Sequence, residues 1–441
     1  STHLLICAPA ASPGIISKNT ATYRMLVIGS SFSRARGGNV RLVGKKKNAT
    51  AVRGIFERLR AERPLRGETL ERAIGLARAV PGVVISDVRI DRAPKDPARH
   101  QLTITVGAAR FSALAYTDNR GTIGNARMRA YSSFSLSSLA VPGDRLQVDL
   151  FTIPYDRFRY GYGQVKASIP LNADGLRLSG AASYGDQHQR ISAHQDGYSR
   201  QFNGELSYPF AKSRAFSILG SLMLADWKNE QDQAGTTIQR DRIQVVRAWV
   251  EITRVTNIRL GGRIVVSRGV DLGPATNRGD PLASRPFASS KFTKFNASFD
   301  LTARLFDRAR LRLEASAQYS TKPLLAPEEF ALGGSRIGRA FDFNEVTGDH
   351  GFGGMAEVAL PLGDSKQGPK AVEIFAFADG GGAFRRRSSP RLPKNQWLAS
   401  MGAGTRFSAL GILWSGEFGI PIARSDADRG VRAFFSATRI F

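Results

Sequence analysis

The feature that most constrains the fold is a long series of alternating segments that begins at Gly107. From there to the C-terminus, apolar and polar residues alternate with a period of two, in segments bounded by Gly, Asp, Asn and Pro. In the segment 295–305, for example, Phe295, Ala297 and Phe299 alternate with polar residues. This pattern predicts strands with one apolar and one polar face. Segments of about 9–11 residues also match the length of a strand that crosses a bilayer at a tilt.

The length of this region predicts the size of a barrel. About 330 residues follow Gly107, and at roughly 20 residues per strand and connection they allow about sixteen strands. An even number brings both ends of the barrel to the same side. No window holds the roughly 20 consecutive apolar residues of a spanning helix. We therefore expect a membrane all-β fold, a sixteen-stranded antiparallel outer-membrane β-barrel over residues 107–441.

A small α+β domain is predicted ahead of the barrel, over residues 23–106. Short strands are expected at 24–28, 83–90 and 101–106, because apolar residues alternate or cluster there. Two helices are expected between the first two strands, at 48–61 and from about Pro64 to Ala79, because their apolar residues recur at helical spacing. The order β-α-α-β-β suits helices packed on one face of a short sheet.

The N-terminal segment 1–22 stays unassigned. The chain starts at Ser1, and no charged region precedes the apolar residues 4–6, so no secretory signal peptide is recognisable. We interpret the sequence as a fragment of a longer protein. The single cysteine, Cys7, excludes an intramolecular disulfide framework.

The strong positive charge raises the alternative of a nucleic-acid-binding protein. The chain has 63 Lys+Arg against 37 Asp+Glu, a formal charge of +26. Most of these basic residues are dispersed at alternate strand positions, and only 45–47 and 385–387 are clusters. We therefore expect no nucleic-acid partner, and interpret the dispersed arginines as a basic lumen wall. A soluble DNA-binding protein would instead need no detergent and would bind with steep salt dependence.

No enzymatic motif stands out. The five histidines form no H-E-x-x-H or cysteine-paired metal pattern, and no G-x-S-x-G sequence or nucleotide-binding P-loop occurs. We expect no catalytic residues, metal or cofactor. An outer-membrane barrel enzyme is the alternative of a different class, and it would place His188 or His194 in a catalytic site at the extracellular rim.

Two short motifs near the C-terminal end carry the most specific signal. The first crowds glycines around Arg339 between two strand-like segments; glycines permit positive φ and close packing, and an arginine away from water needs a carboxylate. Its residues are Leu332, Gly333, Gly334, Gly338, Arg339, Phe341, Gly348, Asp349 and Gly351. The second motif comprises Phe377, Asp379 and Gly381.

These motifs resemble those of the outer-membrane transporters of two-partner secretion (TpsB, the haemolysin secretion/activation type). The family pattern is L-G-G, R-G-Y/F and G-D-x-G in a loop that folds back into the lumen around 330–351, followed by F-x-D-x-G on the barrel wall. Ala340 replaces the family glycine. The resemblance implies that the guanidinium of Arg339 pairs with Asp379 and latches the loop. The terminal Phe441 resembles the end of a closing barrel strand, from which Arg439 departs.

The resemblance extends to the small domain and implies a function. Residues 63–65, 70–72 and 80–83 look like the second POTRA domain of the family, whose members normally carry a plug helix and two POTRA domains. The chain is thus expected in the Gram-negative outer membrane, with its POTRA domain in the periplasm. There it would bind an unfolded haemolysin- or adhesin-like exoprotein and export it without nucleotide hydrolysis. Expected partners are this exoprotein, outer-membrane lipid and the barrel-assembly machinery. The alternative within the superfamily is an assembly or insertion factor.

Overall fold

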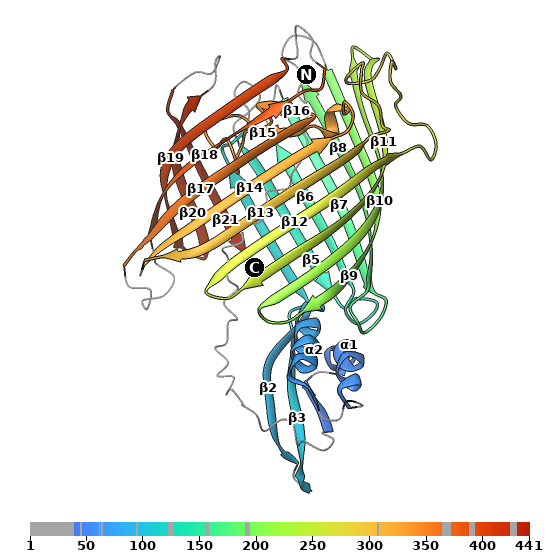
Figure 1. Ribbon diagram of the computed structural model, residues 1–441, viewed down its shortest axis with the longest axis vertical. Helices are drawn as coiled ribbons and strands as arrows, with labels where there is room; N and C mark the ends of the chain where they lie inside the picture. Colours follow the sequence, from blue (N-terminus) through green and yellow to red (C-terminus); the bar gives the residue numbers. More distant parts are fainter. Residues whose placement is uncertain are drawn as a thin grey trace.

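The structure is a computed structural model in which a small α/β domain lies below a large β-barrel (Figure 1). It describes residues 39–44, 46–60, 62, 65–93, 96–121, 128–154, 158–189, 195–306, 308–363, 372–387, 393–423 and 430–441. The segment 1–22, the strand expected at 24–28 and His194 lie outside these residues. None of the described helices is long and apolar enough to cross a membrane.

The small domain is a three-stranded sheet with two helices. Its elements are β1 (Asn39–Gly44), α1 (Lys46–Glu57), a 3₁₀ turn (Arg58–Arg60), α2 (Gly67–Ala79), β2 (Val83–Ala93) and β3 (Asp96–Ala108). The strand order is β1-β3-β2, with β1 parallel and β2 antiparallel to β3. The described order is β-α-α-β-β, with the first strand at 39–44.

Helical spacing of apolar residues explains why the helices form and how they pack. Val52 and Phe56 on α1, and Leu76 on α2, are buried in one core with Ile104 of β3. Each such side chain contributes about 1.5–3 kcal/mol when fully buried. The turn at Pro81 and Gly82 ends α2 and leads directly into β2, because Gly82 adopts φ of +76°.

Sixteen of the described strands close into an antiparallel barrel, which confirms the predicted architecture. They are β4 (Phe111–Asp118), β5 (Arg129–Ser137), β6 (Arg145–Ile153), β7 (Phe158–Pro170), β8 (Arg177–Gln189), β9 (Gln195–Lys212), β10 (Phe216–Gln233), β11 (Thr236–Val255), β12 (Ile258–Val270), β13 (Thr293–Leu305), β14 (Ala309–Ser320), β17 (His350–Leu362), β18 (Val372–Phe384), β19 (Asn395–Ala409), β20 (Ile412–Ala423) and β21 (Arg432–Ile440). Sequential neighbours pair, and β21 closes the barrel against β4 with Ser436 opposite Asp118 and Ile440 opposite Leu114.

The period-two pattern decides which side chains face the lumen. On β13, Phe295 and Phe299 are 44% and 39% exposed on the outer face, whereas Lys294 points inward, where it is buried against Glu328. Most of the barrel strands exceed the expected length of about ten residues by a few positions. Three exceed it by far: β9 and β10 have 18 residues each and β11 has 20. Their pairing reaches the Ala234–Gly235 turn with one register shift in each ladder, between Gln231 and Asp232 and between Ile218 and Leu219, so this part of the wall is taller than a bilayer needs.

Both ends of the barrel lie beside the small domain. Strand β4 starts at Phe111, shortly after β3 ends at Ala108. The backbone N–H of Phe441 donates to the carbonyl oxygen of Ala113 at 2.9 Å, which ties the last residue to the first strand. The guanidinium of Arg439 lies 4.6 Å from the centroid of the Phe441 ring, so this departure from an apolar residue is covered by a stacked aromatic ring.

Candidate functional site

The connection between β14 and β17, residues 321–349, folds back into the barrel and is called the lumenal loop below. It contains a 3₁₀ turn (Ala326–Glu328) and a two-stranded hairpin of β15 (Phe330–Leu332) and β16 (Val346–Gly348). Gly333, Gly334 and Gly338 follow β15 and all have positive φ, as the sequence predicted for a sharply bent loop.

Apolar side chains fix this hairpin to the inner wall. Five loop residues form a buried cluster with three wall residues on β17, β18 and β19: Phe330, Leu332, Ile337, Phe341, Val346, Met355, Ala383 and Leu398. Leu332 and Phe341 of the predicted motif therefore act in packing. Gly351 on β17 is required for this packing, because a Cβ at that position would lie 2.0 Å from Cδ1 of Phe330.

Asp379 on β18 holds the tip of the loop through the backbone. Its carboxylate accepts hydrogen bonds from the N–H of Gly338 at 2.9 Å and from the N–H of Arg339 at 3.1 Å. The hydroxyl of Ser400 on β19 also donates to it. Both carboxylate oxygens are therefore occupied without the arginine side chain, and a charged acceptor makes such hydrogen bonds stronger than neutral ones.

The guanidinium of Arg339 pairs with two glutamates, which differs from the expected pairing with Asp379. Its Nη1 donates to Glu357 on β17 at 2.7 Å, and its Nε donates to Glu417 on β20 at 3.3 Å, with a further ion pair through Nη2. Its carbon Cζ lies 3.8 Å from the ring centroid of Phe377. The physical reason for the difference is that the backbone N–H groups of the turn lie against Asp379. The side chain of Arg339 therefore extends beyond Asp379 to the two glutamates.

Further arginines compensate the same glutamates. Arg406 on β19 donates to Glu357 at 2.7 and 2.8 Å, and Arg120, after β4, pairs with Glu417 and donates to the carbonyl oxygen of Arg339 at 2.9 Å. The result is a chain of alternating charges along the lumen wall, called the lumenal clamp below: Arg406, Glu357, Arg339, Glu417 and Arg120. Each buried charge has an opposite neighbour, which such burial requires.

Asp349, the aspartate of the G-D-x-G motif, lies at a second junction. Its carboxylate, which has no exposed surface, accepts hydrogen bonds from Nη1 of Arg285 at 2.6 Å, from the N–H of Leu324 at 2.7 Å and from the N–H of Arg386 at 2.8 Å. It thereby joins the lumenal loop to the loops after β12 and β18. Arg285 also contacts Glu329 at 2.9 Å.

The remaining motif residues lie at close contacts between backbones. A Cβ at Gly348 would come 2.5 Å from the nitrogen of Phe384, and one at Gly381 would come 2.2 Å from the oxygen of Phe352. Ala340, which replaces a family glycine, has no positive φ. Alanine therefore adopts this backbone without strain. Its Cβ faces Gly419, where an added Cβ would lie only 3.1 Å away.

Nothing in the described residues resembles a metal centre, since no group of three or more His, Cys, Asp or Glu converges there. His188 lies between Asp186 and Asp196, at 3.2 and 2.7 Å, at the end of β8 and the start of β9. It is on a different part of the barrel wall from the lumenal clamp.

Sequence reasoning found Arg339 and Asp379 but missed the other partners. Glu357 and Glu417 occupy lumen-facing positions of their strands, which the period-two pattern could have shown. Choosing these two among the other acidic residues required the register between strands. Arg285 lies in a loop with no recognisable motif.

Comparison with known proteins agrees with this arrangement. The family described as haemolysin secretion/activation protein ShlB/FhaC/HecB matches residues 101–407. No curated protein sequence gave a significant match.

Solved structures show the same fold. CdiB from Escherichia coli has a TM-score of 0.74 and 16% identity over 93% of this chain and 77% of its own. CdiB from Acinetobacter baumannii has 0.73 and 17%, over 93% and 74%. BamA from Haemophilus ducreyi lacking POTRA domains 1–3 has 0.60 and 12%, over 92% and 85%. The family match covers well over half of the sequence, and the chain therefore belongs to the haemolysin secretion/activation family ShlB/FhaC/HecB, the outer-membrane transporters of two-partner secretion.

Proposed function

We propose that this chain exports an unfolded exoprotein of the haemolysin or adhesin type through its barrel, and that the lumenal clamp keeps the lumenal loop seated for this task. The observation that carries the proposal is the burial of Arg339, 5% exposed, between Glu357 and Glu417 in the lumen of a barrel of this family. A loop that served only as a surface connection would need neither the buried charges nor their cost of desolvation.

The small domain acts as a POTRA domain in this proposal and lies in the periplasm. Its position at the end where the barrel begins and finishes supports this orientation (Figure 1). An unfolded exoprotein would reach this domain first, and a free sheet edge could bind it by main-chain hydrogen bonds. Folding of the exoprotein outside the cell, without nucleotide hydrolysis, would draw it through.

Outer-membrane lipid and the barrel-assembly machinery are the other proposed partners. Large apolar side chains point outward around the wall: Phe202, Ile264 and Phe418 are 58%, 64% and 61% exposed. A continuous band of this kind is what a lipid-facing barrel surface requires. Insertion of such a barrel from the periplasm would need assistance, because its apolar strands are exposed before it closes.

The clamp can be tested by secretion of a co-produced exoprotein of the two-partner secretion type. Arg339→Ala and, separately, Asp379→Ala should reduce secretion by about tenfold or more while the barrel still inserts and shows its heat-dependent shift on a gel. Arg336→Ala is the matched control, because this arginine is in the same loop but is exposed, and it pairs with Glu314 outside the clamp. Secretion at the wild-type level by both clamp variants would reject the role.

A second candidate is an assembly or insertion factor, which the likeness to BamA favours at the level of the fold. The two functions differ in what is lost when the chain is depleted. A transporter should affect one exoprotein, whereas an assembly factor should lower the amounts of many outer-membrane proteins.

A further inference from the structure

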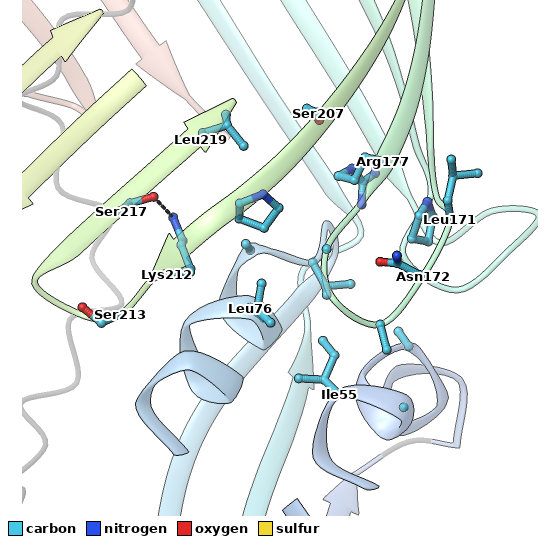
Figure 2. A pocket seen from close by; sticks show the side chains of 18 of the residues that line it. Ile55, Leu76, Leu171, Asn172, Arg177, Ser207, Lys212, Ser213, Ser217 and Leu219 are labelled. Carbon is cyan, nitrogen blue, oxygen red and sulfur yellow. Dashed lines mark hydrogen bonds between the residues drawn. The ribbon is translucent and has the colours of Figure 1, made fainter. Parts of the chain in front are cut away.

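A cavity of about 650 Å³ separates the small domain from the near rim of the barrel (Figure 2). The helices α1 and α2 contribute Ile55 and Leu76 to one wall. The turns between β7 and β8 and between β9 and β10 contribute Leu171 and Lys212 to the other. This space lies outside the lumenal clamp, and it will be called the rim cavity.

Specific contacts attach the small domain to the rim of the barrel beside the cavity. Arg72 on α2 donates to the carbonyl oxygens of Phe210 at 2.9 Å and of Pro209 at 3.1 Å, and Arg58 pairs with Asp174. Gly75 permits the close approach, because a Cβ there would lie 3.0 Å from the carbonyl oxygen of Lys212. The small domain is thus attached at two points.

The lining of the rim cavity includes residues on the lumen-facing side of the barrel wall. Leu219 and Thr253 line the cavity and lie on the same face of their strands as Ala225 and Val245. Ala225 and Val245 pack inside the barrel against the loop residue Phe292, so this face points to the lumen. An extended chain lying along α2 would therefore pass over Leu219 and enter the lumen without crossing lipid.

The charge on the lining is positive and incompletely neutralised. Lys212, Arg214 and Arg177 line the rim cavity, and Glu251 is the only acidic residue among the described lining residues. Lys212 donates to the hydroxyl of Ser217 at 3.3 Å, and Arg177 donates to Ser168 at 2.8 Å and to the carbonyl oxygen of Gly143 at 3.1 Å. These hydrogen-bond partners are neutral. Asp144 also attracts Arg177, but Lys212, Arg214 and Arg177 still leave the lining with a net positive charge that favours an anion from outside.

We propose that the rim cavity is the port through which the exoprotein passes into the barrel, and that it selects extended segments combining apolar with acidic side chains. Apolar residues would pack on Ile55, Leu76 and Leu171, and carboxylates would pair with Lys212 and Arg214. This inference rests on the proposed export function and names the chemistry of the segment that is exported.

An anionic lipid surface is the rival partner for these cations. It is less favoured because the lining includes lumen-facing wall residues and the helices of the small domain, which a lipid head group in the membrane plane would not reach. A polypeptide can contact all of these surfaces at once.

Binding of model peptides to the purified protein in neutral detergent tests the proposal without any exoprotein. One fluorescent peptide alternates leucine with serine and aspartate, and its counterpart carries lysine in place of each aspartate. The acidic peptide should bind about tenfold or more tightly than the basic one. Lys212→Glu with Arg214→Glu should remove or reverse this preference.

Arg254→Glu is the matched control. Arg254 is exposed at the same rim. It lies on the outward face of β11 with Val250 and Ile252, and it does not line the rim cavity. This variant should keep the preference for the acidic peptide. A heat-dependent gel shift verifies that each variant is a folded barrel.

Three results would overturn the inference. The first is equal binding of both peptides, and the second is an equal effect of Arg254→Glu. The third combines two observations: phosphatidylglycerol added to the micelles displaces the acidic peptide, and the Lys212 and Arg214 variants no longer bind this lipid. Together they would assign the cations to lipid. Failure of the proposed export function would be seen in a separate measurement: the unaltered chain would secrete no exoprotein, independently of the peptide-binding results.

Discussion

The lumenal clamp predicts that Arg339 and Asp379 make separate contributions to seating the loop. Asp379→Ala removes two hydrogen bonds from the N–H groups of Gly338 and Arg339. At about 1.5–3 kcal/mol for each bond to a charged group, partly replaced by water, this costs about 3 kcal/mol of loop attachment. Arg339→Ala leaves those amides in place and removes the ion pairs with Glu357 and Glu417.

The cost of Arg339→Ala is also about 3 kcal/mol. Stranding a buried charge costs about 3–5 kcal/mol, and the lower end applies because Glu357 keeps Arg406 and Glu417 keeps Arg120. The two substitutions remove different hydrogen bonds, but the two residues are neighbours that also attract each other electrostatically, so the double variant should lose somewhat less than the sum, about 5 kcal/mol. A direct pair between the two side chains would instead give about 3 kcal/mol for each single variant and for the double.

Amide hydrogen exchange of the loop measures these energies. The N–H groups of Gly333 and Phe341 are suitable reporters, because they bond to carbonyl oxygens within the loop that neither substitution touches. Each single variant should speed their exchange on the order of 100-fold, and the double variant on the order of 10³–10⁴-fold. A double variant whose amides exchange no faster than those of the single variants would show that Arg339 and Asp379 do not contribute separately to loop attachment.

Three further predictions concern other parts of the molecule. Arg285→Ala should free the loops that meet at Asp349, at a cost of about 3 kcal/mol, and speed their cleavage by an added protease; unchanged cleavage would contradict the role of this junction. The pKa of Asp144, in the turn after β5, is lowered: burial alone would raise it, but hydrogen bonds from the N–H groups of residues 139–141 outweigh burial. Its stabilisation is therefore present above its ordinary pKa of 3.8 and lost as the pH falls below that value, so thermal unfolding of Asp144→Asn should depend less on pH in this acid range than that of the unaltered chain. Gly75→Leu should push α2 away from the rim and expose the domain connection to protease, whereas Gly67→Leu, where a Cβ meets nothing within 4 Å, should not.

The barrel was predictable because its physics is repeated in every strand. A lipid-facing wall needs alternation over about ten residues, and a closed even-numbered barrel follows from the length of the alternating region. Strands β9, β10 and β11 are much longer than this, because the thickness of the bilayer does not limit strand pairing outside it.

The clamp was only partly predictable. The sequence motif pointed to Arg339 and Asp379, but it carried no sign that backbone amides would occupy Asp379. Glu417 is 78 positions from Arg339, and only the closing of the barrel brings it to the loop tip. Contacts between distant strands depend on register, which short motifs do not encode.

The two helices and the last two strands of the small domain were predictable, but its first described strand, β1 (Asn39–Gly44), and its docking were not. Helical spacing gave both helices, and the alternating segments gave β2 and β3. Its attachment to the barrel depends on Arg72 and Gly75, whose partners are backbone atoms of β9. Contacts of this kind leave no pattern in the amino-acid sequence.

A disulfide between the loop tip and the wall tests whether the lumenal loop is held inside the barrel. Cβ of Ala340 lies 3.1 Å from a Cβ built at Gly419, close to the separation of about 3.5–4.5 Å in disulfides. With Cys7→Ser removing the only native cysteine, Ala340→Cys combined with Gly419→Cys should cross-link in isolated outer membranes under mild oxidation. Free thiols at both positions, with the loop-tip thiol open to an impermeant maleimide added outside the cells, would contradict a loop held inside the barrel.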